Sequence, residues 1–385
     1  MALDSHSQSD EENSSQTGDS WFSEKGLYSD IVISTRVDLH RNLANYPFPS
    51  KMSNDEARSI YYLVFDAFNH TSIADSCRAI LTSNLDSNGK RILQEREVLE
   101  KDFENPSSGL VLRNDGKVSC MINGEDHLKL SAFKSGYAPL DVLKEVSDLD
   151  IELQKSLQFA AGAEFGYLTS NLLDAGSGMK YSFVLHLPGL ALMEKISLLS
   201  AREKQKGFNF YERYGTSGMD FLSSQKFSSS SLGCFYVLGN INCFTGSEAD
   251  QEKALEDEIQ YIMEIEKEAR SQAFEKKPSI VKNYVLRAIS LARASLFVTL
   301  REGLDMAGSI MTGLDSLFIG NVSRQNLNSL LYRMQDGHLN FVAESGNFPF
   351  DEDIAESEKM KRERLRALII QETLENVRIL NKGKS

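Results

Sequence analysis

Apolar residues are spaced like those of helices in some parts of the chain and like those of strands in others. Residues 53–56 (SNDE) form a capping box, with serine at the N-cap and glutamate three positions later. Ile60, Val64 and Phe68 follow at helical spacing. This stretch therefore predicts a helix that begins after Ser53 and buries one face.

Between residues 78 and 133 the pattern changes to short apolar runs, which predict strands. Residues 114–117 (NDGK) separate two of these runs and are typical of a hairpin turn. Because hairpins join antiparallel neighbours, we expect an antiparallel sheet from this region. The predicted strands cover residues 79–82, 109–112, 117–122 and 128–133, and residues 30–34 add a short one.

Helical and strand patterns are mixed up to Pro278, and only helical patterns follow it. Residues 248–276 predict a long helix with one apolar face, which Pro278 ends. Other predicted helices cover residues 140–159, 190–201, 280–299, 304–311, 323–334 and 353–380, and further strands cover 181–187, 208–211 and 234–238. We therefore expect a disordered acidic tail over residues 1–20, a mixed domain over 21–277 and an all-helical domain over 278–385.

Charge and composition exclude several classes of function. The chain has 42 Lys and Arg against 55 Asp and Glu, a formal charge of -13, which argues against nucleic-acid binding. No basic segment with an apolar run opens the chain, and no apolar stretch is long enough to span a membrane. The cysteines lack CxxC spacing, which favours reduced thiols in a cytoplasmic protein without a zinc or other metal site. These cysteines are Cys77, Cys120, Cys234 and Cys243.

Ionisable side chains cluster in residues 123–129 (NGEDHLK), directly after the alternating run 118–122 (VSCMI). A strand end that carries a carboxylate, an imidazole and an ammonium group together is a candidate site. A charged, solvated strand end is the alternative interpretation. Further segments favour the site: residues 34–43 (STRVDLHRNL), 165–180 (FGYLTSNLLDAGSGMK) and 184–188 (VLHLP).

In this order and spacing, the segments resemble those of the ATP:guanido phosphotransferases, the family of creatine and arginine kinases. The chain is most similar to the bacterial protein-arginine kinases, over about residues 21–385. The resemblance implies an α/β (α+β) fold, with an antiparallel sheet flanked by helices and an all-α C-terminal domain. It also implies transfer of the γ-phosphoryl group of Mg²⁺-bound ATP to a guanidinium nitrogen, with arginine residues of proteins as acceptors.

The resemblance also implies roles for single residues. Glu125 matches the catalytic carboxylate, which orients the guanidinium group and accepts a proton. Arg36, Lys129 and Lys180 match positions that bind phosphate. A further group would lie near the nucleotide: His186 beside the base, and Arg213 in a segment that resembles the family's Arg-Gly-x-x-Gly-Glu. The Ser-rich loop over residues 223–231 would be the mobile lid.

Several positions depart from the family pattern. Asp38 stands where the family has a second phosphate-binding arginine, and Asn171 stands where it has a reactive cysteine. Gly124 replaces a glutamate, the segment after Arg213 lacks its glutamate, and residues 351–356 are acidic where a phosphoarginine pocket is expected. These departures leave a second hypothesis open: a catalytically silent relative that acts as a regulatory or binding protein.

The candidate residues also have structural interpretations. Arg36 is an alternative ion-pair partner of Asp38, and His186 is an alternative core histidine. Lys129 and Lys180 are equally consistent with solvated charges, and we expect His127 to be a packing residue and Asn171 a filler. For partners, the resemblance implies a protein substrate or adaptor protein and a homodimer formed through the helical domain.

Overall fold

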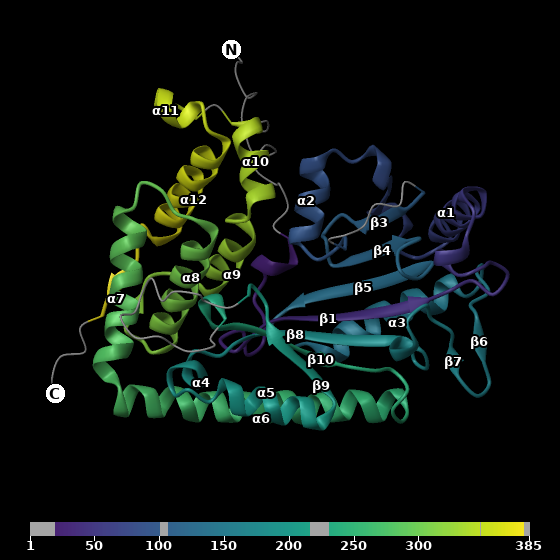
Figure 1. Cartoon of the computed structure of the whole chain (residues 1–385), viewed down its shortest axis with the longest axis horizontal. Helices are drawn as coiled ribbons and strands as arrows, with labels where there is room; N and C mark the ends of the chain where they lie inside the picture. Colours follow the sequence, from purple (N-terminus) through teal and green to yellow (C-terminus); the bar gives the residue numbers. More distant parts are fainter. Residues whose placement is uncertain (1–19, 101–106, 216–230, 347, 381–385) are drawn as a thin grey trace, which may run out of the picture.

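The computed structural model describes residues 20–100, 107–215, 231–346 and 348–380. Within these ranges, eight strands form one antiparallel sheet flanked by helices (Figure 1), as the sequence predicts. From edge to edge the strands are β2 (Cys77–Leu81), β3 (Gly109–Arg113), β4 (Val118–Ile122), β5 (Leu128–Ser135), β1 (Val32–Arg41), β8 (Met179–His186), β10 (Phe235–Asn240) and β9 (Phe208–Glu212). Strand β1 is longer than expected and lies at the centre.

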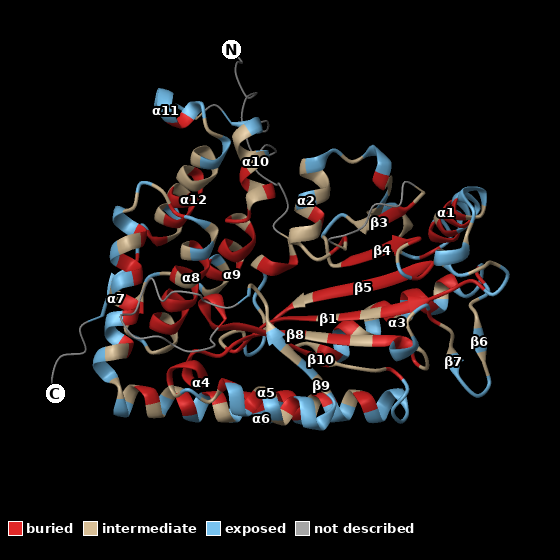
Figure 2. Cartoon of the chain, viewed as in Figure 1, coloured by how far each residue is buried: buried red, intermediate tan, exposed pale blue. Residues whose placement is uncertain are grey.

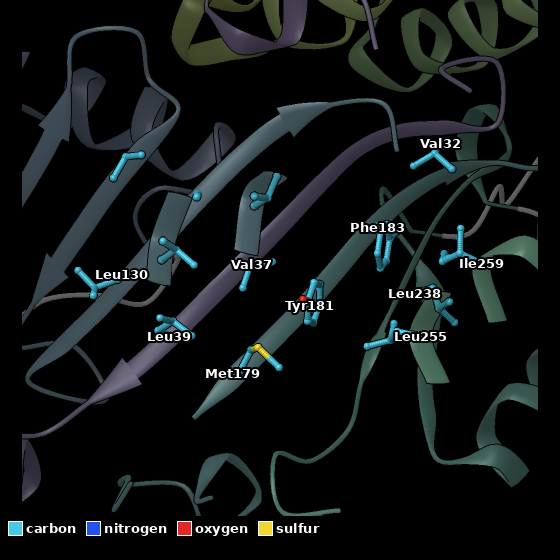
Figure 3. Packing of buried hydrophobic residues seen from close by; sticks show 14 of the residues in the cluster. Val32, Val37, Leu39, Leu130, Met179, Tyr181, Phe183, Leu238, Leu255 and Ile259 are labelled. Carbon is cyan, nitrogen blue, oxygen red and sulfur yellow. The ribbon is translucent and has the colours of Figure 1, made fainter. Parts of the chain in front are cut away.

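One face of the sheet is apolar and packs against helices α3 (Pro139–Leu153) and α6 (Glu248–Lys276). Val37 and Leu39 of β1 point to this face, because alternate residues of a strand share a side. They lie in register with Tyr181 and Met179 of β8, which are also buried. Figure 3 shows these side chains together with Leu255 and Ile259 of α6. The packing leaves the opposite face of β1, β5 and β8 for polar side chains.

Capping explains where the main helices begin. The side chain of Ser53 accepts a hydrogen bond from the Glu56 amide at the start of α1 (Asn54–Phe68), which confirms the capping box. Helix α6 spans the predicted residues and begins with a second box of Ser247 and Asp250. Helix α7 (Pro278–Ala294) follows directly, with Pro278 in its first turn, where a missing N–H has no cost.

Three predicted elements are wrong in detail. The strand region also contains a helix, α2 (Ser87–Glu95), capped by Asp86. The predicted helix 190–201 is two helices, α4 (Pro188–Leu192) and α5 (Ile196–Lys206), because Glu194 has a left-handed φ of 59° between them. The predicted helix 353–380 divides into α11 (Glu352–Ala355), α12 (Glu358–Leu374) and β12 (Arg378–Ile379), which pairs with β11 (Ile319–Gly320).

The C-terminal part adds α8 (Leu300–Asp315), α9 (Arg324–Arg333) and α10 (Asp336–Ser345). Its core is continuous with the region before β1, because Phe22 stacks on Tyr332 of α9 with ring centroids 4.3 Å apart. Trp21 in turn stacks on Phe133 of β5. Buried residues therefore extend from the sheet into the helices (Figure 2). The domain boundary at residue 278 stays a prediction.

Three further observations concern the cysteines, the possibility of a membrane span and the N-terminal tail. All four cysteines are free thiols, and burial raises the pKa of Cys120 and Cys243. No helix in the described ranges is long and apolar enough to cross a membrane. The predicted disordered tail, residues 1–20, lies outside the described residues except for Ser20.

Candidate active site

Polar side chains of three neighbouring strands share the second face of the sheet. Arg36, Asp38 and His40 alternate along β1 with the apolar residues of the other face. The register places Asp38 opposite Lys180 of β8 and His40 opposite Lys129 of β5. Because directly paired residues point to the same side, all five side chains lie on one surface. The three candidate phosphate ligands on the strands are thus brought together.

Arg36 is held by two carboxylates. Its Nε donates to Asp38 Oδ1 at 2.7 Å, and its Nη1 donates to the backbone oxygen of Glu97 at 3.0 Å and lies 3.8 Å from Glu97 Oε2. Burial alone would lower the pKa of Arg36, but Asp38 and Glu97 raise it. Burial alone would likewise raise the pKa of Asp38, but Arg36 and Lys129 lower it. The alternative of an internal Arg36–Asp38 pair is confirmed.

Arg213 approaches the same point from the end of β9. Its Nη2 lies 3.1 Å from Glu97 Oε1 and donates to the Tyr332 hydroxyl at 3.4 Å. Burial opposes its charge, yet Glu97 raises the pKa of Arg213 well above the ordinary value. The Nε and Nη1 of Arg213 are buried without a hydrogen-bond partner in the described structure. Glu97 therefore bridges two arginines, and one of them retains unused donors.

The two lysines are also paired. Lys129 Nζ lies 2.5 Å from Glu100 Oε1, and Lys180 Nζ lies 2.5 Å from Asp174 Oδ1. Asp174 is buried, whereas the Glu100 side chain is 38% exposed. Each of the four candidate phosphate-binding cations thus has a carboxylate partner from this chain.

Glu125 lies in the loop that joins β4 to β5. Asn123 opens this loop in the left-handed region, with φ of 58°, and its amide N–H donates to the His127 carbonyl. Glu125 is exposed at the tip. Partial burial and the neighbouring charges of Asp126 and Asp174 raise its pKa. The predicted catalytic carboxylate is therefore accessible and a stronger base than an ordinary glutamate.

Asp126, the next residue, has the opposite environment. It is buried and accepts hydrogen bonds from the Asn42 side chain at 2.6 Å and the Ser170 amide at 2.7 Å. His40 Nδ1 lies 3.0 Å from its second oxygen. Burial alone would raise the pKa of Asp126, but these hydrogen bonds lower it. Adjacent carboxylates with opposite shifts have different roles, and here Asp126 positions the loop that carries Glu125.

His127 is a packing residue, as expected. Its Nδ1 accepts a hydrogen bond from the Leu43 amide, so Nε2 carries the proton and donates to the Pro47 carbonyl at 2.9 Å. Burial lowers the pKa of His127. The imidazole is therefore neutral and fixes the chain after β1 to the Glu125 loop.

The loop over residues 171–178 closes the site from the other side. Asn171 accepts a hydrogen bond from the Leu173 amide and begins the short 3-10 helix η5 (Leu172–Asp174). Asn171 is thus a local cap, which confirms its interpretation as a filler. Gly178 has φ of 62°, and a Cβ there would lie 2.6 Å from Arg41 Nη1. Arg41 in turn binds both oxygens of Asp150 at 3.1 Å and anchors this end of β1.

His186 lies apart from these groups. Its ring is fully buried, with its centroid 5.0 Å from that of Phe235, and burial lowers its pKa well below the ordinary value. In this conformation the ring has no surface from which to contact a nucleotide. The alternative of a core histidine describes it better, and its role beside the base stays a prediction.

Sequence reasoning missed the anions that complete the site. Glu97, Glu100 and Asp174 pair with the candidate cations, and Tyr332 reaches Arg213 from the helical part. No spacing rule connects these residues to β1, because they come from separate segments. The hydrogen bond between Asn42 and Asp126 could have been expected, because both residues lie within the segments that define the candidate site.

Two further predictions concern the mobile lid and the absence of a metal site. Most of the lid predicted over residues 223–231, and the end of the segment after Arg213, lie outside the described residues. Among the residues that are described, no group of three or more His, Cys, Asp and Glu side chains could hold a metal ion.

Comparison of the sequence with protein families gives a match over residues 59–269 to the ATP:guanido phosphotransferase C-terminal catalytic domain. Proteins named protein-arginine kinase are similar over nearly the whole chain. One from Geobacillus sp. (strain WCH70) is 28% identical over 91% of this chain and 96% of its own length. Another from Bacillus subtilis (strain 168) is 27% identical over 90% of this chain and 93% of its own length.

Solved structures support the same fold. The duplicated taurocyamine kinase from Schistosoma mansoni has a TM-score of 0.55 at 19% identity, over 65% of this chain and 34% of that one. A lombricine kinase has a TM-score of 0.50 at 16% identity, over 65% of this chain and 68% of that one. Because the family match covers more than half of the sequence and the sheet has the corresponding fold, the chain belongs to the ATP:guanido phosphotransferase family.

Proposed function

We propose that this protein transfers the γ-phosphoryl group of ATP to arginine residues in proteins. The observation that supports this most is Glu125, an accessible carboxylate with a raised pKa beside the cationic face of the sheet. Similarity to protein-arginine kinases over 91% of the chain favours protein arginine over a free guanidino compound. A homodimer through the helical part stays a prediction.

In the proposed reaction, Glu125 acts on the guanidinium group and the cations act on the phosphates. Glu125 accepts hydrogen bonds from the guanidinium group and takes up the proton that its nitrogen loses. That nitrogen forms a bond to the γ-phosphorus as the bond to the bridging oxygen breaks, and ADP leaves. Arg36, Arg213 and Lys129 stabilise the charge on the phosphate oxygens.

Binding of ATP requires an exchange of partners. Glu97 and Glu100 occupy the donors that would contact phosphate, so both carboxylates have to withdraw as the triphosphate enters. They lie in the segment after α2, outside the sheet, whereas Asp38 is part of β1. Arg213 keeps two further donors, Nε and Nη1, but both are buried, so a phosphate oxygen reaches them only after the neighbouring groups move.

The deciding experiment uses the full chain, Mg-ATP and an unfolded arginine-containing protein, with phosphoarginine measured by mass spectrometry. Glu125→Gln keeps the size of the side chain and removes its basicity, so the yield is expected to fall by about 10²- to 10⁴-fold. Glu375→Gln, at an exposed position in the C-terminal part, is the matched control and keeps the full yield. An equal yield from wild type and Glu125→Gln contradicts the proposal.

A second candidate function is that of a non-catalytic binding or regulatory protein. The pairing of Arg36 with Asp38 favours it, because a fixed anion in a phosphate site repels ATP. Thermal unfolding of wild type and Asp38→Arg with Mg-ATP separates the two. A large rise in the unfolding temperature of wild type with Mg-ATP supports the kinase. No rise for wild type, together with a rise for Asp38→Arg, supports the binding protein.

A further inference from the structure

A groove of about 600 Å³ lies on the outer side of the loop that approaches Glu125. Its walls are the hairpin of β6 (Ala161–Gly162) and β7 (Gly166–Tyr167), the helix η5 and the start of α6. Three large apolar side chains at the groove are exposed: Phe165 by 67%, Leu172 by 82% and Phe244 by 58%. Apolar side chains gathered at one concave surface are typical of a binding site for another molecule.

The charges at the groove are of one sign. Glu164 and Glu248 line it, and no lysine, arginine or histidine does. Neither carboxylate has an ion-pair partner among the described residues. An occupant that fits this surface therefore carries an apolar side chain and a positive charge nearby.

The groove and Glu125 share one structural wall. The Ser170 amide donates to Asp126, the residue after Glu125, at 2.7 Å. On the far side of the same loop, Tyr167 and Gly176 exchange backbone hydrogen bonds of 2.8 and 3.1 Å. Within the loop, Asp174 is buried and contributes, after partial burial and Asp126, to the raised pKa of Glu125, whereas Leu172 is exposed at the groove. The loop that lines the groove is thus hydrogen-bonded to the residue that follows Glu125.

We infer that the groove binds the residues that flank the target arginine in an unfolded protein segment. An aromatic or aliphatic side chain of the substrate enters among Phe165, Leu172 and Phe244, and basic residues face Glu164 and Glu248. This inference rests on the proposed function. The chain's own residues 1–19 contain several acidic residues and no lysine or arginine, so they do not match the charge of the groove.

Binding of fluorescent peptides tests the inference without ATP. Two short peptides are compared, each with one central arginine and a neighbouring lysine, one with leucine and one with serine nearby. Wild type is expected to bind the leucine peptide about tenfold more tightly, and Leu172→Ser together with Phe244→Ser removes that preference. Leu198→Ser is the matched control, because Leu198 is 73% exposed on α5, away from the groove, and leaves the preference unchanged.

The outcomes separate this inference from the proposed function. Peptide binding that depends on the groove, without any phosphoarginine from wild type, rejects only the kinase activity. Normal phosphorylation with equal affinity of wild type and the double variant for both peptides rejects only the groove. The inference about the groove is also rejected if wild type binds neither peptide. A change of oligomeric state in the double variant rejects it too, because a second copy of the chain would then occupy the groove.

Discussion

The two sides of the candidate active site differ in how much of their charge is already neutralised. On the acceptor side, Glu125 is exposed at the loop tip, and partial burial of its carboxylate together with like charges raises its pKa. On the donor side, Arg36, Arg213 and Lys129 are each paired with a carboxylate. In the proposed reaction, the acceptor side receives the guanidinium group as it stands, whereas the donor side exchanges carboxylates for phosphates.

The anions of the donor side also differ from one another. Asp38 lies two residues from Arg36 on the central strand, and both side chains are 14% exposed, so this pair is part of the sheet. Glu97 and Glu100 come from a connecting segment and are 41% and 38% exposed. Because these two carboxylates are partly exposed and lie outside the sheet, they can turn toward solvent more easily than Asp38, although the cations that they pair with are buried. For the proposed entry of ATP, Asp38 is therefore the stronger obstacle, and Glu97 and Glu100 can withdraw.

The largest expected effect in this comparison is on stability and concerns Asp126, which holds the Glu125 loop. Asp126→Asn replaces an acceptor of three hydrogen bonds by an amide and is expected to lower the free energy of unfolding by about 2–3 kcal/mol at neutral pH. The folded pKa of Asp126 is lowered, so its stabilising charge is present above the unfolded value of about 3.9 and is lost as the pH falls through the folded value. The deficit of the variant therefore shrinks in acid.

Urea unfolding at neutral and acidic pH measures this difference. Asp141→Asn is the control, because Asp141 pairs with Lys134 at the surface and is 65% exposed. Its expected cost is below about 1 kcal/mol. A deficit of Asp126→Asn that stays constant with pH contradicts the assigned role of the ionised carboxylate.

The next effect concerns the fixed anion of the donor side. Asp38→Asn keeps an oxygen that accepts from Arg36 and removes the negative charge, so the affinity for Mg-ATP is expected to rise by about tenfold, or about 1.4 kcal/mol. Isothermal titration calorimetry measures it. Asp351→Asn, at an exposed residue without a capping side-chain bond, is the control. An affinity equal to that of wild type means that Asp38 faces away from the phosphates.

How far the sequence predicts these two sides depends on the range of the interactions. Local rules predict the Ser53 capping box, the antiparallel sheet and the pairing of Arg36 with Asp38. They miss helix α2, because the short apolar runs around it suggest strands throughout. They also miss Glu97, whose contacts with Arg36 and Arg213 cross 61 and 116 positions of sequence and depend on tertiary packing alone.

A smaller effect is expected at the bridging anion. Glu97→Gln removes the charge shared by Arg36 and Arg213, so Mg-ATP is expected to bind about threefold more tightly, or about 0.7 kcal/mol. Stability falls at the same time, because the buried Arg213 loses its carboxylate. Titration calorimetry and thermal unfolding measure the two changes. Tighter binding without any loss of stability would show that Glu97 does not hold Arg213 in solution.

The smallest effect is expected at the exposed anion, Glu100. Glu100→Gln frees Lys129 Nζ, and the expected gain in Mg-ATP affinity is about twofold, or about 0.4 kcal/mol, because solvent at the partly exposed carboxylate weakens the pair. Salt screens such a pair, so the ratio of the two affinities is expected to approach one near 1 M salt, where the Debye length is about 3 Å. Titrations at low and high salt measure the ratio. If the gain in Mg-ATP affinity is larger for Glu100→Gln than for Asp38→Asn, Glu100 and not Asp38 is the main obstacle to ATP.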